Sequence, residues 1–404
     1  MRKITVIDAM PGKYKTTFAM QNMVGMRDMG FCFIYITPYL DEVDRVVDYL
    51  KENNVSVSVP SSFKGKGSKS EHLKKLIAER KNIITTHALF DRIDGETLEL
   101  FRTNQYVLYL DEVHEVVKKH YMSEYDLALL KTSNYIKIQE DCSIDWIAED
   151  YDGRFEEFKN LCNLGALFYY ADSVYIWTFP IEIFKYVHHT FILTHMFEGQ
   201  IQSSYYQMYN MEYEKKYVKR LDDGVCTLID YKLEYDERDR ENIKDKINIY
   251  EGHLNYDKAI NLSSSFFNRS DASMFKVIKN NMYNYFSNIV KGSSEENMWT
   301  TLKDYKNVLK GKGYTKGFVP LNARATNKYK HKTNLAYIYN RYINPIDRNF
   351  FEMRNIKVNE DLYALSELIQ WIFRSAIREG KPINIYIPSL RMRKLLKTYL
   401  DKIA

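Results

Sequence analysis

A lysine and two threonines follow the first apolar run of the chain, and their spacing suits phosphate binding. Residues 4–8 (Ile-Thr-Val-Ile-Asp) predict a short strand, and Ala9-Met10-Pro11-Gly12-Lys13-Tyr14-Lys15-Thr16-Thr17 comes directly after it. A helical stretch follows, so backbone N–H groups at the helix start would face an anion. Lys15 would reach the β- and γ-phosphates of a nucleotide, and the Thr16 hydroxyl would bind Mg²⁺. The alternative is a strand-to-helix turn in which the Lys-Thr pair is incidental.

Two adjacent carboxylates end a second apolar run. Residues 106–114 read Tyr-Val-Leu-Tyr-Leu-Asp-Glu-Val-His, which predicts a buried strand that stops at Asp111 and Glu112. A strand end beside a phosphate loop supplies the hard oxygen ligands that Mg²⁺ prefers. Asp111 would hold the metal, directly or through water, and Glu112 would polarise the attacking water. The alternative is an exposed acidic strand end without a ligand.

Zinc chemistry is not indicated by the histidines or the cysteines. His114 begins no H-E-x-x-H motif, because Lys118 occupies the position of the second histidine. The four cysteines form no C-x-x-C pair. We therefore expect a reduced, intracellular chain.

The elements that must position these side chains alternate along the first two hundred residues. Most of the candidate strands are continuous apolar runs, which is typical of strands buried on both faces of a parallel sheet. Helical patterns at residues 41–53 and 70–79 lie between them. Such alternation predicts an α/β fold with a doubly wound sheet, whose ligands bind at the carboxyl ends of the strands. The strands are expected at residues 4–8, 31–37, 82–86, 106–111, 173–178 and 191–194.

The rest of the chain contains an insertion and a second domain. Residues from about 115 to 171 carry many aromatic and acidic side chains, and we interpret them as a mostly helical insertion. Beyond a boundary near residue 200 the chain again alternates, which predicts a first domain at 1–200 and a second at 201–404. Helices are expected there at residues 272–290, 296–309, 361–378 and 390–402, and strands at 317–321, 334–339 and 383–388.

Composition narrows the function classes. With 404 residues, 45% hydrophobic and 27% charged, the chain is an ordinary globular protein of two or three domains. No apolar run is long enough for a membrane helix, so we expect no membrane partner. Residues 300–332 hold nine lysines and arginines against one aspartate, which indicates a polyanion partner such as nucleic acid. A solvated basic face is the alternative.

These residues resemble superfamily 2 helicases of the DExH type, and in particular the compact helicase-like proteins of bacteriophages. Asp111-Glu112-Val113-His114 is similar to the D-E-x-H box, and residues 9–16 are similar to A-x-x-G-x-G-K-T, with Tyr14 replacing a glycine. Thr37-Pro38 and Thr85-Thr86-His87 resemble nucleic-acid-contacting motifs of the first domain. Trp177-Thr178-Phe179 lies where the family has its S-A-T motif, and departs from it.

The resemblance continues near the end of the chain. Residues 370–378, Gln-Trp-Ile-Phe-Arg-Ser-Ala-Ile-Arg, resemble motif VI, Q-x-x-G-R-x-x-R, with Phe373 replacing the glycine and Arg378 one position beyond the last arginine of the motif. On one helix Gln370, Arg374 and Arg378 would share a face, from which an arginine could reach a γ-phosphate. The alternative is an amphipathic helix with solvated arginines. Residues 322–327, Asn-Ala-Arg-Ala-Thr-Asn, resemble motif V.

The resemblance implies two RecA-like domains with parallel sheets and a cleft between them. It also implies an ATPase with ATP and Mg²⁺ as cofactors, whose hydrolysis is coupled to movement on single-stranded or forked DNA, with RNA not excluded. We expect a cytoplasmic protein, in the host cytoplasm if phage-encoded, with possible phage replication proteins as partners; the oligomeric state is unknown. The nucleic acid would contact Thr37, Thr86, Arg324, Thr326 and Lys328.

Two other functions remain open on the sequence. A viral DNA-packaging ATPase shares the phosphate loop and the acidic strand end. A nucleic-acid-binding regulatory protein with a defective ATPase would explain Tyr14 in the loop.

Overall fold

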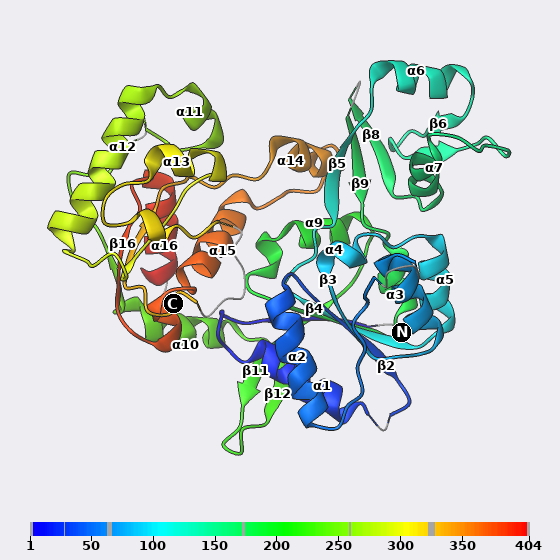
Figure 1. Cartoon of the computed structure of the whole chain (residues 1–404), viewed down its shortest axis with the longest axis horizontal. Coiled ribbons are helices and arrows are strands. Elements are labelled where there is room, and N and C mark those ends of the chain that lie inside the picture. Colours follow the sequence, from blue (N-terminus) through cyan, green and yellow to red (C-terminus); the bar gives the residue numbers. More distant parts are fainter. Residues whose placement is uncertain are drawn as a thin grey trace. The chain divides into compact units, whose positions relative to one another are not determined.

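The computed structural model describes residues 3–27, 29–62, 67–171, 174–257, 260–321 and 328–401. Contacts group them into two compact units (Figure 1). The first unit comprises Met1–Asp8, Tyr14–Ile229 and Asn344–Val358. The second comprises Ala9–Lys13, Asp230–Ile343 and Asn359–Ala404. The expected domain boundary near residue 200 stays a prediction.

A seven-stranded sheet forms the centre of the first unit, in the order β12-β11-β1-β10-β4-β2-β3. Neighbours from β11 to β3 run parallel. All six residues of β4 are buried, which agrees with the continuous apolar run read from the sequence. The strands are β1 (Lys3–Asp8), β2 (Cys32–Thr37), β3 (Ile83–Thr86), β4 (Tyr106–Asp111), β10 (His189–Thr194), β11 (Glu214–Arg220) and β12 (Cys226–Asp230).

Amphipathic helices pack on this sheet. In α2 (Leu40–Glu52), Val43, Val46, Val47 and Leu50 recur at helical spacing and are buried. They share one core with α1 (Lys15–Gly25) and with side chains of β2 and β4, and α1 and α2 lie side by side (Figure 1). The other helices here are α3 (Lys69–Ala78), α4 (His87–Phe90), α5 (Gly95–Thr103), α8 (Glu182–Tyr186) and α9 (Ile201–Met208).

The insertion is a mixed α/β segment, so the prediction of a mostly helical region is wrong. Three of its strands form an antiparallel sheet in the order β5-β9-β8, and β6 pairs with β7. Apolar and aromatic residues in short runs, such as Leu167-Phe168, favour strands over helices. Its elements are β5 (Val117–Tyr121), α6 (Glu124–Thr132), β6 (Ile136–Ile138), β7 (Ile144–Trp146), α7 (Glu156–Asn163), β8 (Leu167–Ala171) and β9 (Val174–Thr178).

A helix from late in the chain completes the first unit. In α14 (Pro345–Glu352), the Phe350 ring lies 5.5 Å from that of Phe168 on β8. Just beyond it, Arg354 stacks on both rings and donates a hydrogen bond of 2.9 Å to the carbonyl of Asp141. These contacts anchor residues 344–358 to the antiparallel sheet.

A four-stranded parallel sheet forms the second unit, in the order β13-β16-β15-β14. Its strands are β13 (Ile247–Ile249), β14 (Asn297–Thr300), β15 (Asn334–Tyr337) and β16 (Ile383–Tyr386). Its helices are α10 (Leu233–Lys244), α11 (Ser264–Arg269), α12 (Ala272–Asn284), α13 (Lys306–Leu309), α15 (Glu360–Ile372) and α16 (Leu390–Asp401).

Three expectations for this unit are wrong. Residues 296–309 begin with β14 rather than a helix, because Asn297–Thr300 are buried and pair with β15. Residues 317–321 form no strand, and only Phe318 bridges to Trp299. The helix expected at 361–378 ends at Ile372, because the Ser375 hydroxyl donates to the Ile372 carbonyl at 2.7 Å.

No helix among the described residues has the length and apolar character needed to cross a membrane.

Candidate nucleotide-binding site

Residues 9–14, which are expected to form a phosphate loop, connect β1 to α1 and place a left-handed residue before the helix. Tyr14 has φ 53° and ψ 13°, and Gly12 has φ +88°. A glycine adopts such a conformation without strain, whereas a tyrosine does so at a cost of about 1–2 kcal/mol. The Tyr14 ring is 41% exposed and lies 4.9 Å from the Arg220 guanidinium. Tyr14 therefore changes the side chain of the loop while keeping the backbone that a glycine would take.

The first turn of α1 is suited to an anion. Tyr14 provides no side-chain cap, and the first turn contains no acidic residue. The helix dipole and the N–H groups of this turn therefore favour a negatively charged ligand. Lys15, Thr16 and Thr17 are half-buried here, and the Thr16 hydroxyl lies 3.5 Å from Oδ1 of Asp111.

The two carboxylates at the end of β4 lie in a site that disfavours negative charge. Burial, together with the charges of Glu42 and Glu112, raises the pKa of Asp111 to about 7. Glu112 has φ 72°, and its buried Oε2 has no hydrogen-bond partner among the described residues. Such strain and lost pairing are common at functional sites.

These residues fit a bound Mg²⁺. A divalent cation would neutralise the buried acidic pair, and Asp111 with the nearby Thr16 hydroxyl supplies hard oxygen ligands. Within the described part of the chain, no group of three metal-binding side chains is present. Phosphate oxygens and water would complete the coordination, as Mg²⁺ prefers at nucleotide sites.

His114 of the D-E-x-H sequence is tied to the protein rather than open to a ligand. Its Nε2 lies 2.8 Å from Oδ1 of Asp91, and its backbone N–H donates to Oε1 of Gln202 at 2.8 Å. Burial alone would raise the pKa of Asp91, but His114 and Lys118 outweigh it and hold that pKa below its usual value. His114, beside the acidic strand end, and Lys118 on β5 thus share Asp91 as a partner.

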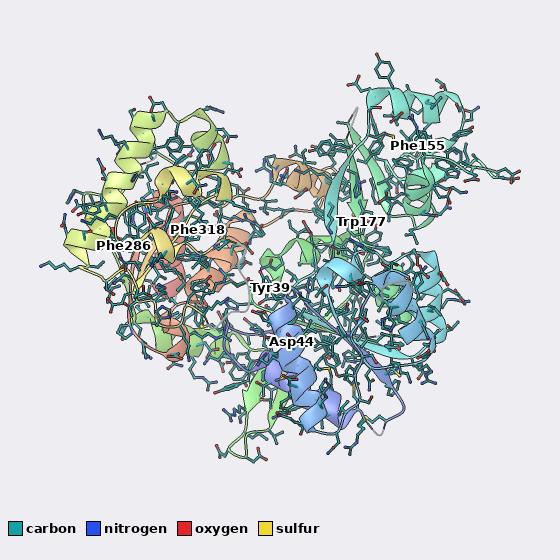
Figure 2. All side chains as sticks on the ribbon, in the orientation of Figure 1. Tyr39, Asp44, Phe155, Trp177, Phe286 and Phe318 are labelled. Carbon is teal, nitrogen blue, oxygen red and sulfur yellow. The ribbon has the colours of Figure 1, made fainter. Side chains whose placement is uncertain are left out.

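The strand β10 brings a loop to the site that the sequence interpretation missed. It lies between β1 and β4, so its carboxyl end is beside both. After it, the N–H groups of Met196 and Phe197 donate to the buried Asp8 carboxylate at 2.8 and 3.0 Å. Trp177, which lies at the position of the S-A-T motif in the sequence, belongs instead to β9 of the antiparallel sheet (Figure 2). In the sequence, the signal for this loop is Thr194, which ends the apolar run that begins at Phe191.

The arginines of the motif VI sequence lie in the second unit and do not share one helical face. Gln370 is on α15, whereas Arg374 follows the end of that helix and Arg378 lies in a short 3₁₀ helix, Ala376–Glu379. Gln370 and Arg374 are buried and Arg378 is exposed. Gly12 belongs by its contacts to the same unit as Arg378. The two residues are close: a side-chain carbon placed on Gly12 would lie 4.0 Å from Cγ of Arg378.

Lys13, also grouped with the second unit, has its own partner. Its Nζ lies 2.6 Å from Oδ1 of Asp239 on α10, whose side chain is buried. This ion pair holds the middle of the phosphate loop.

The residues expected to contact nucleic acid are only partly brought together. Thr37 and Thr86 pair at the ends of the parallel strands β2 and β3, with Thr37 buried and Thr86 half-buried. Lys328 is exposed in the second unit. Arg324 and Thr326 lie outside the described residues.

A prophage protein is similar to this chain over nearly its full length. It is 40% identical to "SPbeta prophage-derived uncharacterized protein YonV" of Bacillus subtilis (strain 168) across 99% of both chains. The chain belongs to the YonV family. Residues 241–400 match the family model described as the YonV C-terminal Rossmann-like domain, and residues 117–177 match the YonV middle domain. The second match coincides with the insertion.

Solved structures share the fold. The structure titled "XPD_APO" superposes with a TM-score of 0.52 at 11% identity, covering 98% of this chain and 95% of that one. "Structure of S. tokodaii Xpd4" gives 0.50 at 11% identity, with 98% and 93% covered. The predicted α/β fold with two RecA-like domains on parallel sheets is confirmed, and these XPD structures share it.

Proposed function

We propose that this chain is an ATPase that moves along nucleic acid, as a helicase or translocase acting on DNA in phage replication or recombination. One observation carries the proposal: the Thr16 hydroxyl at the start of α1 lies 3.5 Å from Asp111 at the end of β4. This pairs a phosphate loop with an acidic strand end, as a nucleoside triphosphatase requires.

The roles of the residues follow from their chemistry. The N–H groups of Gly12–Thr17 and the Lys15 ammonium would hold the phosphates. Glu112, whose Oε2 has no partner among the described residues, would accept a hydrogen bond from the attacking water and orient it. Thr16 and Asp111 would hold Mg²⁺, which when bound supplies positive charge beside the phosphates.

Three residues of the second unit are proposed to act on the same phosphates. Arg378 would stabilise the charge that develops during phosphoryl transfer, with Arg374 and Gln370 as further contacts. The proximity of Arg378 to Gly12 supports this role. An arginine of this kind contributes about 10³–10⁵ in rate.

DNA is the proposed track. The basic stretch at residues 300–332 and the exposed Lys328 support binding to a polyanion. Thr37, Thr86, Arg324 and Thr326 remain proposed contacts. The likeness in fold to XPD structures over most of the chain favours a helicase over a packaging motor.

Hydrolysis of ATP by the wild type and by Glu112→Gln, with and without single-stranded DNA, tests the proposal. We expect DNA-stimulated hydrolysis that falls by at least about 10²-fold in the variant, since it removes the group that orients water. Equal and negligible rates in both proteins would instead support a regulatory protein with a defective ATPase.

A further inference from the structure

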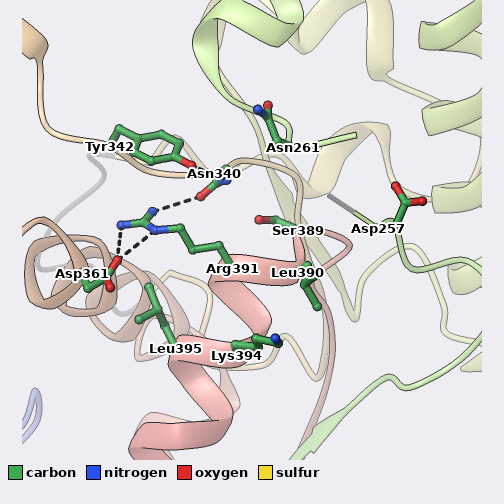
Figure 3. A pocket seen from close by; sticks show the side chains of 10 residues that line it. All are labelled: Asp257, Asn261, Asn340, Tyr342, Asp361, Ser389, Leu390, Arg391, Lys394 and Leu395. Atoms are coloured by element: carbon green, nitrogen blue, oxygen red, sulfur yellow. Dashed lines mark hydrogen bonds and ion pairs between the residues drawn. The ribbon is translucent and has the colours of Figure 1, made fainter. Parts of the chain in front are cut away.

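The second unit contains a cavity of about 440 Å³ that no motif accounts for. Its wall comes from segments that follow β13, β15 and β16 in the chain (Figure 3). In open α/β sheets, ligands bind outside the carboxyl ends of the strands. The position and the size are those of a small-molecule site.

One wall of the cavity is held rigid by Arg391. Its guanidinium donates to Asp361 at 2.9 Å, to the side chain of Asn340 at 3.1 Å and to the carbonyl of Arg341 at 2.6 Å. Figure 3 shows the bonds to Asp361 and Asn340. The positive charge of Arg391 is therefore paired with the carboxylate of Asp361.

The same arginine fixes an aromatic ring in the wall. The Arg391 guanidinium lies 4.5 Å from the Tyr342 ring centroid, and the Tyr342 hydroxyl accepts a hydrogen bond of 3.1 Å from Asn340. The Tyr342 side chain nevertheless remains 37% exposed. A fixed and partly exposed aromatic ring offers a flat surface on which a base can stack.

A lysine on α16 supplies positive charge at the cavity. Lys394 is exposed, and among the described residues it has no ion-pair partner. One turn further on, Lys397 is bound at 2.8 Å by Glu251. Lys394 is therefore the lysine of this helix that can bind a phosphate.

We propose that this cavity binds one nucleotide unit, with the base on Tyr342 and the phosphate on Lys394. The Asn261 side chain on the facing wall provides polar atoms for the edge of the base or for the sugar. The unit belongs to an unpaired strand if the chain is the nucleic-acid motor proposed above, on which this assignment rests. A free nucleotide shares the same chemistry.

Photocrosslinking of the full chain to single-stranded DNA containing 5-iodouracil tests the contact directly. We expect the crosslink in the tryptic peptide that begins at Tyr342, with loss of the crosslink in Tyr342→Ala. Affinity measured by fluorescence anisotropy should fall about 5- to 150-fold in that variant, as expected for one lost stacking contact.

Lys394→Ala keeps the proposal testable if Tyr342→Ala fails to fold, because Lys394 is exposed on a helix surface. Its affinity for DNA should depend less on salt, with the log–log slope reduced by about 0.7. Lys397→Ala removes the same charge from the same helix and is the matched control, with an expected slope equal to that of the wild type.

A second experiment distinguishes the binding of a nucleic-acid strand in the cavity from the binding of a free nucleotide. Binding of nucleoside monophosphates is measured in Lys15→Ala, which disables the phosphate loop, and in Lys15→Ala/Lys394→Ala. Binding that disappears only in the double variant supports a free-nucleotide site in the cavity. DNA affinity, salt slope and crosslinks unchanged by both pocket variants, with no monophosphate binding, overturn the proposal.

The outcomes for the two proposals are distinguishable. DNA-stimulated hydrolysis, with unchanged DNA binding in Tyr342→Ala and Lys394→Ala and no monophosphate binding in Lys15→Ala, would overturn the nucleotide cavity alone. Absence of hydrolysis together with a crosslink at Tyr342 would overturn the motor and support the cavity.

Discussion

Replacing Asp111 by asparagine should stabilise the protein while abolishing hydrolysis. Burial beside Glu42 and Glu112 raises the pKa of Asp111 from 3.8 to about 7. A difference of about 3 between the folded and unfolded pKa corresponds to about 4 kcal/mol. Because the folded pKa is raised, the stability that this carboxyl contributes is present below pH 4 and is lost as the pH rises through 7. At pH 8 the wild type is therefore destabilised by about 4 kcal/mol, and Asp111→Asn is not.

Thermal unfolding in EDTA at pH 5 and pH 8 measures the effect. Between these values the Asp111 contribution changes by about 3 kcal/mol, so the variant should gain more in Tm at pH 8 than at pH 5. At about 2–4 °C per kcal/mol, the gain at pH 8 should be about 8–16 °C. A variant that is less stable than the wild type, or a gain independent of pH, would refute the description of Asp111 as a desolvated carboxyl. Glu352→Gln, on an exposed surface, is the matched control and should change little.

Three further predictions concern the surroundings of the site. Tyr14→Gly should keep hydrolysis within about twofold and relieve about 1 kcal/mol of backbone strain; a tenfold gain in ATPase rate would show that the ring blocks the loop. Asp91→Asn should lower Tm at pH 7, since the lowered pKa of Asp91 reflects stabilising contacts with His114 and Lys118 that are lost only as the pH falls below 4. His189→Gln should reduce acid sensitivity: burial lowers the pKa of His189 to about 4, so the wild type loses stability as the pH falls from 6.5 to 4, and equal acid midpoints for both proteins would contradict this.

The parallel sheets could be predicted because strands buried on both faces are written as continuous apolar runs. The bounds of β4 are those expected, and β1, β2 and β3 differ by one residue at the start. The position of residues 9–14 between a strand and a helix, and of Asp111 at a strand end, could be predicted from the same apolar runs. The binding of phosphate and Mg²⁺ by these residues stays a prediction. The closeness of Thr16 to Asp111 follows from that parallel arrangement.

Contacts between residues that are far apart in the chain could not be predicted from the local sequence pattern. Beyond the end of α15, the Ala376 N–H donates to the Lys332 carbonyl, more than forty residues away in the chain, and not to a carbonyl of its own helix. Similarly, Trp177 ends an apolar run like those of the parallel strands, yet its strand pairs antiparallel with β5 and β8. Local periodicity does not encode the strand that a segment will pair with.

The rate of ATP hydrolysis with and without single-stranded DNA, at low and moderate salt, tests the central claim most directly. We expect stimulation by DNA that weakens with salt and is lost in Lys15→Ala and Arg378→Ala, two variants of the proposed phosphate site. DNA binding without hydrolysis in the wild type, or full activity in Lys15→Ala, would contradict it.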